Sequence, residues 1–211
     1  GFWMVTWFKQ EFGHREALEA EKRGVAPEVV LDEVIRDIPP GAMGLMLQPY
    51  WSPTVNNKYA KGAIIGFGDI HTRAHIYRAI FEGLCFELRR LQEIVQRKTG
   101  MTIREIRVGG GGSRSDVVVQ IAADMFNLPV FRMETSEISA LGAAIDASVG
   151  TGMHPSIEAA VAAMVRKGRM FQPDQKHHKI YTELFNAVYK KSSGTLDAIY
   201  RKIARITGYP S

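Results

Sequence analysis

The chain has 211 residues, enough for one domain or two small ones, and its 45% apolar and 23% charged residues are typical of a soluble globular protein. No apolar run reaches the length of a membrane span, so we expect no membrane partner. The formal charge of +5 is spread over segments that also carry Glu and Asp, which argues against a nucleic acid partner.

The first segment, residues 2–12, is too apolar for a free tail and predicts a buried helix or strand. Because the chain opens at Gly1 directly into this segment, we expect it to be a fragment of a longer protein. Residues 11–23 are charged and predict a helix that Gly24 ends. A further helix is predicted to begin at Pro27 and to end at the following Pro-Pro-Gly.

A short buried strand is predicted at residues 45–47 and a second apolar strand, with glycines inside it, at residues 62–67. The loop between them carries an aromatic pair, Tyr50 and Trp51. Such a pair between prolines is more typical of a rigid loop that plugs the core than of a platform for a base or a sugar. A long amphipathic helix follows over residues 71–98. Its buried side is predicted to carry Ile76, Ala79, Ile80, Gly83, Leu84, Leu88, Leu91 and Val95.

The single cysteine of the chain, Cys85, lies within this helix and cannot form an internal disulfide. Its apolar neighbours Ile80, Phe81, Leu84 and Phe86 indicate a buried thiol rather than a catalytic one. A chain without internal disulfides fits a reducing, cytoplasmic setting.

Two histidines at the start of the long helix, His71 and His75, have a spacing that can hold a metal ion. The glutamate of a zincin motif is absent between them, because residue 72 is Thr, and the chain has no clustered cysteines. We therefore expect an ordinary pair at a helix start, capped by Asp69 or Thr72, and predict no metal ligands in this chain.

Four consecutive glycines, Gly109 to Gly112, form the centre of the segment that organises the chain. Residues 103–108 before them predict a strand, and residues 117–126 after them predict a helix. Glycine permits a positive φ and lets a ligand lie against the backbone, while the N-terminus of the following helix attracts anions. The pattern fits a nucleotide site or a plain tight turn, and it lacks the Gly-Lys-Ser/Thr ending of a P-loop.

The last third of the chain continues the alternation of strands and helices. After a strand at residues 129–131, small side chains crowd a helix at residues 138–149, which we expect to pack tightly against another helix or a sheet. The remaining predicted elements are a helix at 156–166, an extended link at 170–174, and a helical end at 175–207 with a break near Ser192 to Gly194. Together the elements predict an α/β fold with a mixed sheet.

Three blocks of sequence together resemble the FGGY family of carbohydrate kinases. The first resembles the second signature of the family and runs from Gly62 to Glu82, with Phe67 where the family usually has Leu, Ile, Val or Met. The second is the glycine run with the later Gln120 and Asp124, and the third runs from Glu137 to Ala144. Each block alone is a weak signal, but their common order and spacing form a strong one, and the resemblance covers nearly the whole chain.

The resemblance implies that residues 1–211 form a single domain, the C-terminal, nucleotide-binding half of a two-domain sugar kinase. The implied fold is the ribonuclease H-like fold of actin and hexokinase, a mixed sheet flanked by helices. The implied cofactors are ATP and Mg²⁺, the implied reaction is phosphorylation of a sugar or polyol hydroxyl, and the implied partner is the N-terminal domain of the same parent. The sugar, whether pentulose, hexulose or polyol, and a homo-oligomeric state are left open.

The resemblance also assigns nucleotide contacts. Gly111 and Gly112, with Gly110 in the same turn, would pass beside the ribose and the adenine, and Ser115 at the helix start would bond to the base. Gly1 matches a further glycine contact of the family.

Catalytic residues are not assigned in this chain. The family's catalytic base is an Asp near the start of its C-terminal domain, followed by a phosphate-binding Gly-Thr turn, and both are expected upstream of Gly1. Asp69 and Asp116 lie in other motifs, and Thr6 is a weaker nucleotide candidate. We therefore expect the chain alone to hold a nucleotide without catalysing transfer.

Two alternatives remain. A non-catalytic, actin-like ATP-binding module would share the fold and the glycine turn. The parent sequence would distinguish it from a kinase, because only a kinase should have the catalytic Asp and the Gly-Thr turn. A Rossmann dehydrogenase is disfavoured, because its fingerprint should follow the first strand and be trailed by an acidic residue on a second strand.

Overall fold

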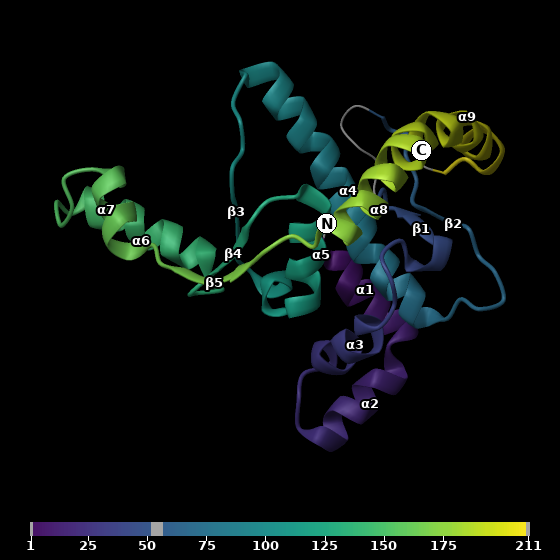
Figure 1. The fold of residues 1–211 in the computed structure, drawn as a ribbon, viewed down its shortest axis with the longest axis horizontal. Helices are drawn as coiled ribbons and strands as arrows, with labels where there is room; N and C mark the ends of the chain where they lie inside the picture. Colours follow the sequence, from purple (N-terminus) through teal and green to yellow (C-terminus); the bar gives the residue numbers. More distant parts are fainter. Residues whose placement is uncertain (1, 52–56, 210–211) are drawn as a thin grey trace.

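The computed structural model describes residues 2–51 and 57–209 (Figure 1). Strands β1 (Met46–Gln48) and β2 (Ala63–Ile65) pair antiparallel. Strand β3 (Ile106–Val108) pairs parallel with β4 (Val130–Met133), and β4 pairs antiparallel with β5 (Lys167–Phe171). The predicted mixed sheet and α/β class are therefore confirmed.

The N-terminal segment forms three helices, α1 (Trp3–Phe12), α2 (His14–Arg23) and α3 (Pro27–Arg36). Gly24 ends α2 in the left-handed conformation, and Pro27 opens α3, as predicted. The expectation that residues 2–12 are buried holds for one face only. Met4 and Phe8 are fully buried in the core, whereas Phe2, Trp3 and Phe12 are more than 40% exposed.

Helix α4 (Arg73–Thr99) is the central element and contacts α1, α3, α5 and β1. Thr72 and His75 form a capping box at its start, and Gly100 ends it with a φ of 69°. Its first half carries the core residues, including Cys85, and burial raises the pKa of that thiol to about 12. The prediction of one buried stripe is wrong for the second half, where the exposed apolar residues are Leu88, Leu91 and Val95.

Helix α5 (Asp116–Phe126) follows the glycine turn and packs against α4 and α8 (Gln175–Leu184). On its other side, Val119 and Ala123 meet Val130 and Phe171 of the three-stranded sheet in a second, smaller core. The predicted extended link near residues 170–174 is in part strand β5. That strand escaped the sequence analysis because four of its five residues are exposed, so burial does not alternate along it.

Helices α6 (Ile138–Gly150) and α7 (Ile157–Met164) pack against each other and project from the rest of the molecule, at the left of Figure 1. The expected tight packing of the small residues on α6 is wrong. The buried residues of α6 are Ile145 and Ser148. The small residues that are exposed instead are Ala140, Gly142, Ala143, Ala144 and Ala147.

The C-terminal segment is helical throughout, as α8, a π-helical stretch (Phe185–Tyr189) and α9 (Lys190–Thr207). The predicted break near Ser192 to Gly194 is wrong, because α9 continues through these positions. The irregularity lies earlier, where the rings of Phe185 and Tyr189 stack on Phe86 of α4. Within the described ranges, no helix combines the length and the hydropathy that a bilayer crossing requires.

Candidate functional site

The glycine run connects β3 to α5, so the predicted order of strand, glycine turn and helix is confirmed. Gly110 has φ 81° and ψ −179°, a conformation that is essentially restricted to glycine. Its N–H donates to the carbonyl of Ser136 at 2.9 Å, and its carbonyl accepts from the hydroxyl of Ser113 at 2.7 Å. Residues Gly111–Arg114 then form a single 3₁₀ turn before α5 begins.

The four glycines differ in what lies beside them. A Cβ on Gly109 would lie 2.2 Å from Ile138 Cγ2, and one on Gly112 would lie 2.5 Å from the Phe2 ring. A Cβ on Gly111 would meet no heavy atom within 4 Å, and the φ of Gly111 lies outside the left-handed region. Gly109 and Gly112 thus permit close packing within the protein, whereas Gly111 borders open space.

Gly111 lines two adjacent cavities, one of about 530 Å³ and one of about 420 Å³. The smaller, polar cavity lies between α1, α3 and the glycine turn. Three predicted nucleotide contacts, Gly111, Gly112 and Ser115, line it together with the weaker candidate Thr6. Gly110 lines the larger, apolar cavity, and Gly1 lies outside the described residues.

Charged side chains of both signs line the polar cavity. Lys9 on α1 forms an ion pair with Glu28 on α3, and Arg114 of the glycine turn lies 3.2 Å from Glu137. Burial raises the pKa of Glu28, but the Lys9 ammonium and hydrogen bonds outweigh it and leave that pKa lowered. The lining thus balances two cations, Lys9 and Arg114, against two carboxylates, Glu28 and Asp32, beside a glycine backbone.

Ser115 lies at the N-cap of α5, where its hydroxyl oxygen accepts from the Val118 N–H at 3.1 Å. The carboxyl of Asp32 on α3 lies near this hydroxyl, at the same cavity. Burial is the largest effect on Asp32 and raises its pKa, while the nearby Ser115 hydroxyl lowers it in part. Within the described part of the chain, Asp32 Oδ1 is buried and has no hydrogen-bond partner.

Sequence reasoning missed Asp32. It is one of three acidic residues on α3, with Glu28 and Glu33, and nothing in the spacing of that helix sets it apart. Only the approach of α3 to the start of α5 gives it a place in the cavity.

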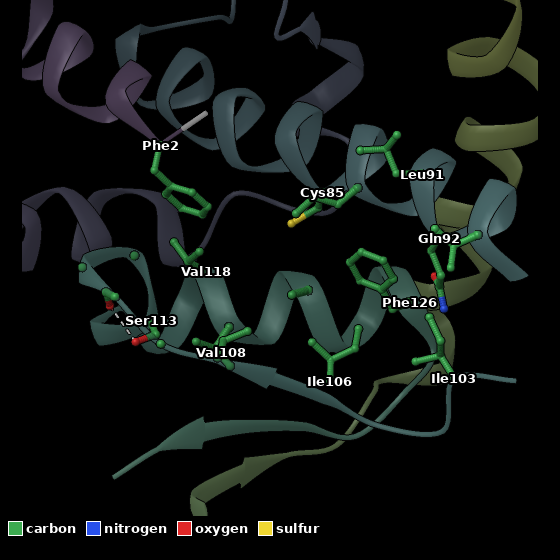
Figure 2. Close-up of a pocket in the computed structure, with 18 residues that line it drawn as sticks. Phe2, Cys85, Leu91, Gln92, Ile103, Ile106, Val108, Ser113, Val118 and Phe126 are labelled. Carbon is green, nitrogen blue, oxygen red and sulfur yellow. Dashed lines mark hydrogen bonds between the residues drawn. The ribbon is translucent and has the colours of Figure 1, made fainter. Parts of the chain in front are cut away.

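The larger cavity is apolar and lies between the exposed half of α4, β3 and α5. Figure 2 shows Leu91 of α4, Phe126 of α5 and Ile106 of β3 around it, with Gln92 among them. Strand β3 is an edge strand of the described sheet, since it pairs with β4 alone. An apolar face beside a sheet edge is typical of a surface that another segment covers.

The remaining sequence candidates have structural roles. His71 Nδ1 accepts from the Gly68 N–H at 2.7 Å, and His75 Nδ1 accepts from the Thr72 N–H at 3.1 Å. No group of three or more His, Cys, Asp or Glu side chains that could hold a metal occurs within residues 2–51 and 57–209. Asp116 is held by Arg132 at 2.5 Å and by Arg169.

The aromatic pair in the loop after β1 also has structural contacts. The Tyr50 hydroxyl donates to Glu87 at 2.7 Å, and the Trp51 ring packs edge-on against Trp7 at 5.3 Å between centroids. Trp51 packs against the main core, which agrees with the expected plug. Residues 52–56 of this loop, including its second proline, lie outside the described residues.

These features define an α/β domain with a mixed sheet, surrounding helices and a glycine turn beside a polar cavity, and comparison with known proteins identifies its family. Residues 5–151 match the model of the FGGY family of carbohydrate kinases, C-terminal domain. The chain belongs to this family. The family match leaves no support for the actin-like module without transferase activity or for the Rossmann dehydrogenase.

Individual relatives are also carbohydrate kinases. An uncharacterized sugar kinase, YgcE, of Escherichia coli is 32% identical over 96% of this chain and 41% of its own length. The xylulose kinase of Bacillus subtilis is 32% identical over 88% of this chain and 36% of its own length. The crystal structure of xylulose kinase from Rhodospirillum rubrum has a TM-score of 0.72 and 28% identity, over 93% of this chain and 38% of that one. The chain thus spans about two-fifths of the length of these relatives.

Proposed function

We propose that this domain binds the nucleotide of ATP in the polar cavity, and that the full-length parent transfers the γ-phosphoryl group to a sugar or polyol hydroxyl. The observation that carries the proposal is the open space beside Gly111, at a cavity that Ser115 and Thr6 also line. A volume of about 420 Å³ is within the range of small-molecule sites. Family membership supports the reaction class.

The polar cavity is the better candidate of the two for the nucleotide. Lys9 and Arg114 provide positive charge for phosphates, and the backbone at Gly111 allows close approach of a ribose. The larger cavity has Gln92 and Ser113 as its only polar side chains among those that line it, so phosphates would be poorly solvated there.

Mg²⁺ would reach the site as a complex with the phosphates. The described residues hold no cluster of carboxylates that could bind it alone. Mg²⁺ normally keeps several waters and is shared between phosphates and one or two protein carboxylates, which fits a domain that contributes only part of the site.

We further propose that residues 1–211 act as a single C-terminal domain and that the N-terminal domain of the same parent completes the enzyme. Two observations support this proposal. The chain spans about two-fifths of the length of its relatives, and the apolar cavity borders the edge of β3 that pairs with no other strand of the described sheet. Catalysis would then depend on closure of the two domains around the sugar, with a base from outside this chain taking the hydroxyl proton.

Calorimetric titration of the 211-residue chain with ADP and Mg²⁺ tests the nucleotide site. We expect saturable binding that Gly111→Val weakens at least tenfold, because the branched side chain would occupy the space beside the turn. Gly142→Val is the matched control, since Gly142 is an exposed position on α6 with equally open surroundings. A folded Gly111→Val protein that binds ADP as tightly as the unchanged chain would refute the site, as would tighter binding of NADH.

A further inference from the structure

Arg114 differs from Lys9, the other cation of the polar cavity, in where its ion-pair partner lies. Lys9 is paired with Glu28, and both of these residues line the cavity. The partner of Arg114 is Glu137, directly before α6, which lines neither the polar nor the apolar cavity. Arg114 is therefore the better placed of the two cations to meet an anionic group of a ligand in the polar cavity.

Two residues of the loop before α6 hold the guanidinium of Arg114. Its Nη2 donates to the Ser136 hydroxyl oxygen at 3.0 Å and to Glu137 Oε1 at 3.2 Å. The Ser136 hydroxyl donates in turn to the same Glu137 oxygen, at 3.1 Å. Each of the three side chains is thus bound by the other two.

These contacts leave part of the Arg114 guanidinium free. Both bonds to the loop use Nη2, whereas Nε and Nη1 also carry N–H donors. Neither Nε nor Nη1 has a hydrogen-bond partner within residues 2–51 and 57–209. The side chain is therefore anchored at one nitrogen and can donate to a phosphate from the others.

A main-chain bond keeps this loop in register with the glycine turn. The Gly110 N–H donates to the Ser136 carbonyl at 2.9 Å. Arg114 and Glu137 are 70% and 73% exposed, so their ion pair adds little to stability. Its larger effect is on conformation, because without the loop contacts an exposed arginine side chain samples many rotamers.

We propose that Glu137, with Ser136, is a positioning residue that holds Arg114 in place to bind a phosphate of the nucleotide. The inference rests on the proposed function, because it concerns the nucleotide bound in the polar cavity. It predicts an effect of the opposite sign to that of charge alone. Removal of the Glu137 carboxylate makes the surroundings less negative, which should strengthen binding of an anion, whereas release of Arg114 should weaken it.

The test is calorimetric titration with ADP and Mg²⁺ and, separately, with adenosine, which lacks the phosphates. The variants are Glu137→Ala, Glu137→Gln, Arg114→Gln, and Glu137→Ala combined with Arg114→Gln. Glu134→Ala is the matched control, because Glu134 is an exposed carboxylate of the same loop that forms no ion pair within the described ranges. Thermal unfolding shows which variants are folded, and Ser136→Ala is the second variant if Glu137→Ala does not fold.

We expect Arg114→Gln to weaken ADP binding about tenfold, the effect of losing a hydrogen bond to a charged group. Glu137→Ala should weaken it about threefold, because the released side chain loses part of that contact. In the Arg114→Gln background, Glu137→Ala should cause no further loss. Glu137→Gln should retain most of the affinity, since the amide oxygen still accepts from Arg114. Adenosine binding should change in none of these variants, and ADP binding should not weaken in Glu134→Ala.

The outcomes separate the inference from the proposed function. Unchanged or tighter ADP binding by a folded Glu137→Ala protein overturns the positioning role and leaves the nucleotide site standing. The same conclusion follows from an equal loss in the Arg114→Gln background, from an equal loss in Glu134→Ala, or from equal losses for ADP and adenosine. Absence of ADP binding to the unchanged chain overturns the proposed function and the inference with it.

Discussion

The hydroxyl of Tyr181 on α8 donates a hydrogen bond of 2.8 Å to Glu82 Oε1 on α4. The same oxygen accepts from Arg78 Nε at 2.8 Å and from the Gly41 N–H at 3.1 Å. Arg78 also donates to the carbonyl of Ile35 at the end of α3. The side chains of the network are buried, so it ties α3, α8 and the Pro-Pro-Gly turn to α4.

Removal of the Tyr181 hydroxyl should destabilise the domain. Tyr181→Phe leaves the buried Glu82 with one donor fewer, and a buried group left unsatisfied costs about 1–3 kcal/mol. Tyr189→Phe is the control, because its bond to Glu87 is longer, at 3.3 Å, and Glu87 keeps Tyr50 and Arg90 as partners. Urea unfolding measures both, and equal free energies of unfolding would contradict the importance of the network.

The glycines of the turn should differ in their tolerance of alanine. Gly110→Ala places a side chain at φ 81° and should cost about 1–3 kcal/mol, the typical cost of such backbone strain. Gly111→Ala has open space and no positive φ, so it should be neutral or stabilise the domain by up to about 1 kcal/mol. Thermal unfolding of the two variants checks the order, and a greater loss for Gly111→Ala would be inconsistent with the turn as described.

Two leucines of α4 should respond differently to truncation. Leu84→Ala removes a core side chain that is 7% exposed and should cost about 2–4 kcal/mol. Leu91→Ala removes one that is 44% exposed and should cost less than about 1 kcal/mol in this chain. In the full-length parent Leu91→Ala should cost more, if the N-terminal domain covers the apolar cavity. An unchanged cost there would argue against that partner surface.

The N-cap of α8 should make stability depend on pH. The backbone N–H groups of His177 and Lys176 donate to Asp174 and lower its pKa below the unfolded value of 3.8. The folded carboxyl binds its proton less readily than the unfolded one. The ionised Asp174 therefore contributes its full stabilisation of the folded state above pH 3.8, and this stabilisation is lost as pH falls through the lower folded pKa. The gap in unfolding free energy between the unchanged chain and Asp174→Ala should therefore narrow below pH 3.8, and a constant gap down to pH 2 would contradict it.

Local chemistry in the sequence determined where most elements begin and end. Gly24 and Gly100 mark helix C-termini because glycine readily adopts the left-handed conformation. Pro27 marks a helix start because its ring fixes φ, and neither property depends on the surrounding structure. The glycine turn before α5 and the family motifs can likewise be recognised from short stretches of sequence. The fold class and the family could therefore be predicted from the sequence.

Only the tertiary structure decided which faces of those elements are covered. The same apolar and small-residue patterns are buried at Leu84 and exposed at Leu91 or along α6, because burial depends on whether a distant segment packs there. The stacking of Phe185 and Tyr189 on Phe86 coincides with the π-helical stretch that no local residue signals.

The candidate site divides in the same way. Gly111 and Ser115 follow from the sequence because the turn and the helix start are local structures, four residues apart. The meeting of Ser115 with Asp32 brings α3 against the start of α5 across a long stretch of chain, and that approach depends on how both helices pack on α4. Residue order determines the turn, whereas the packing of helices determines what the turn faces.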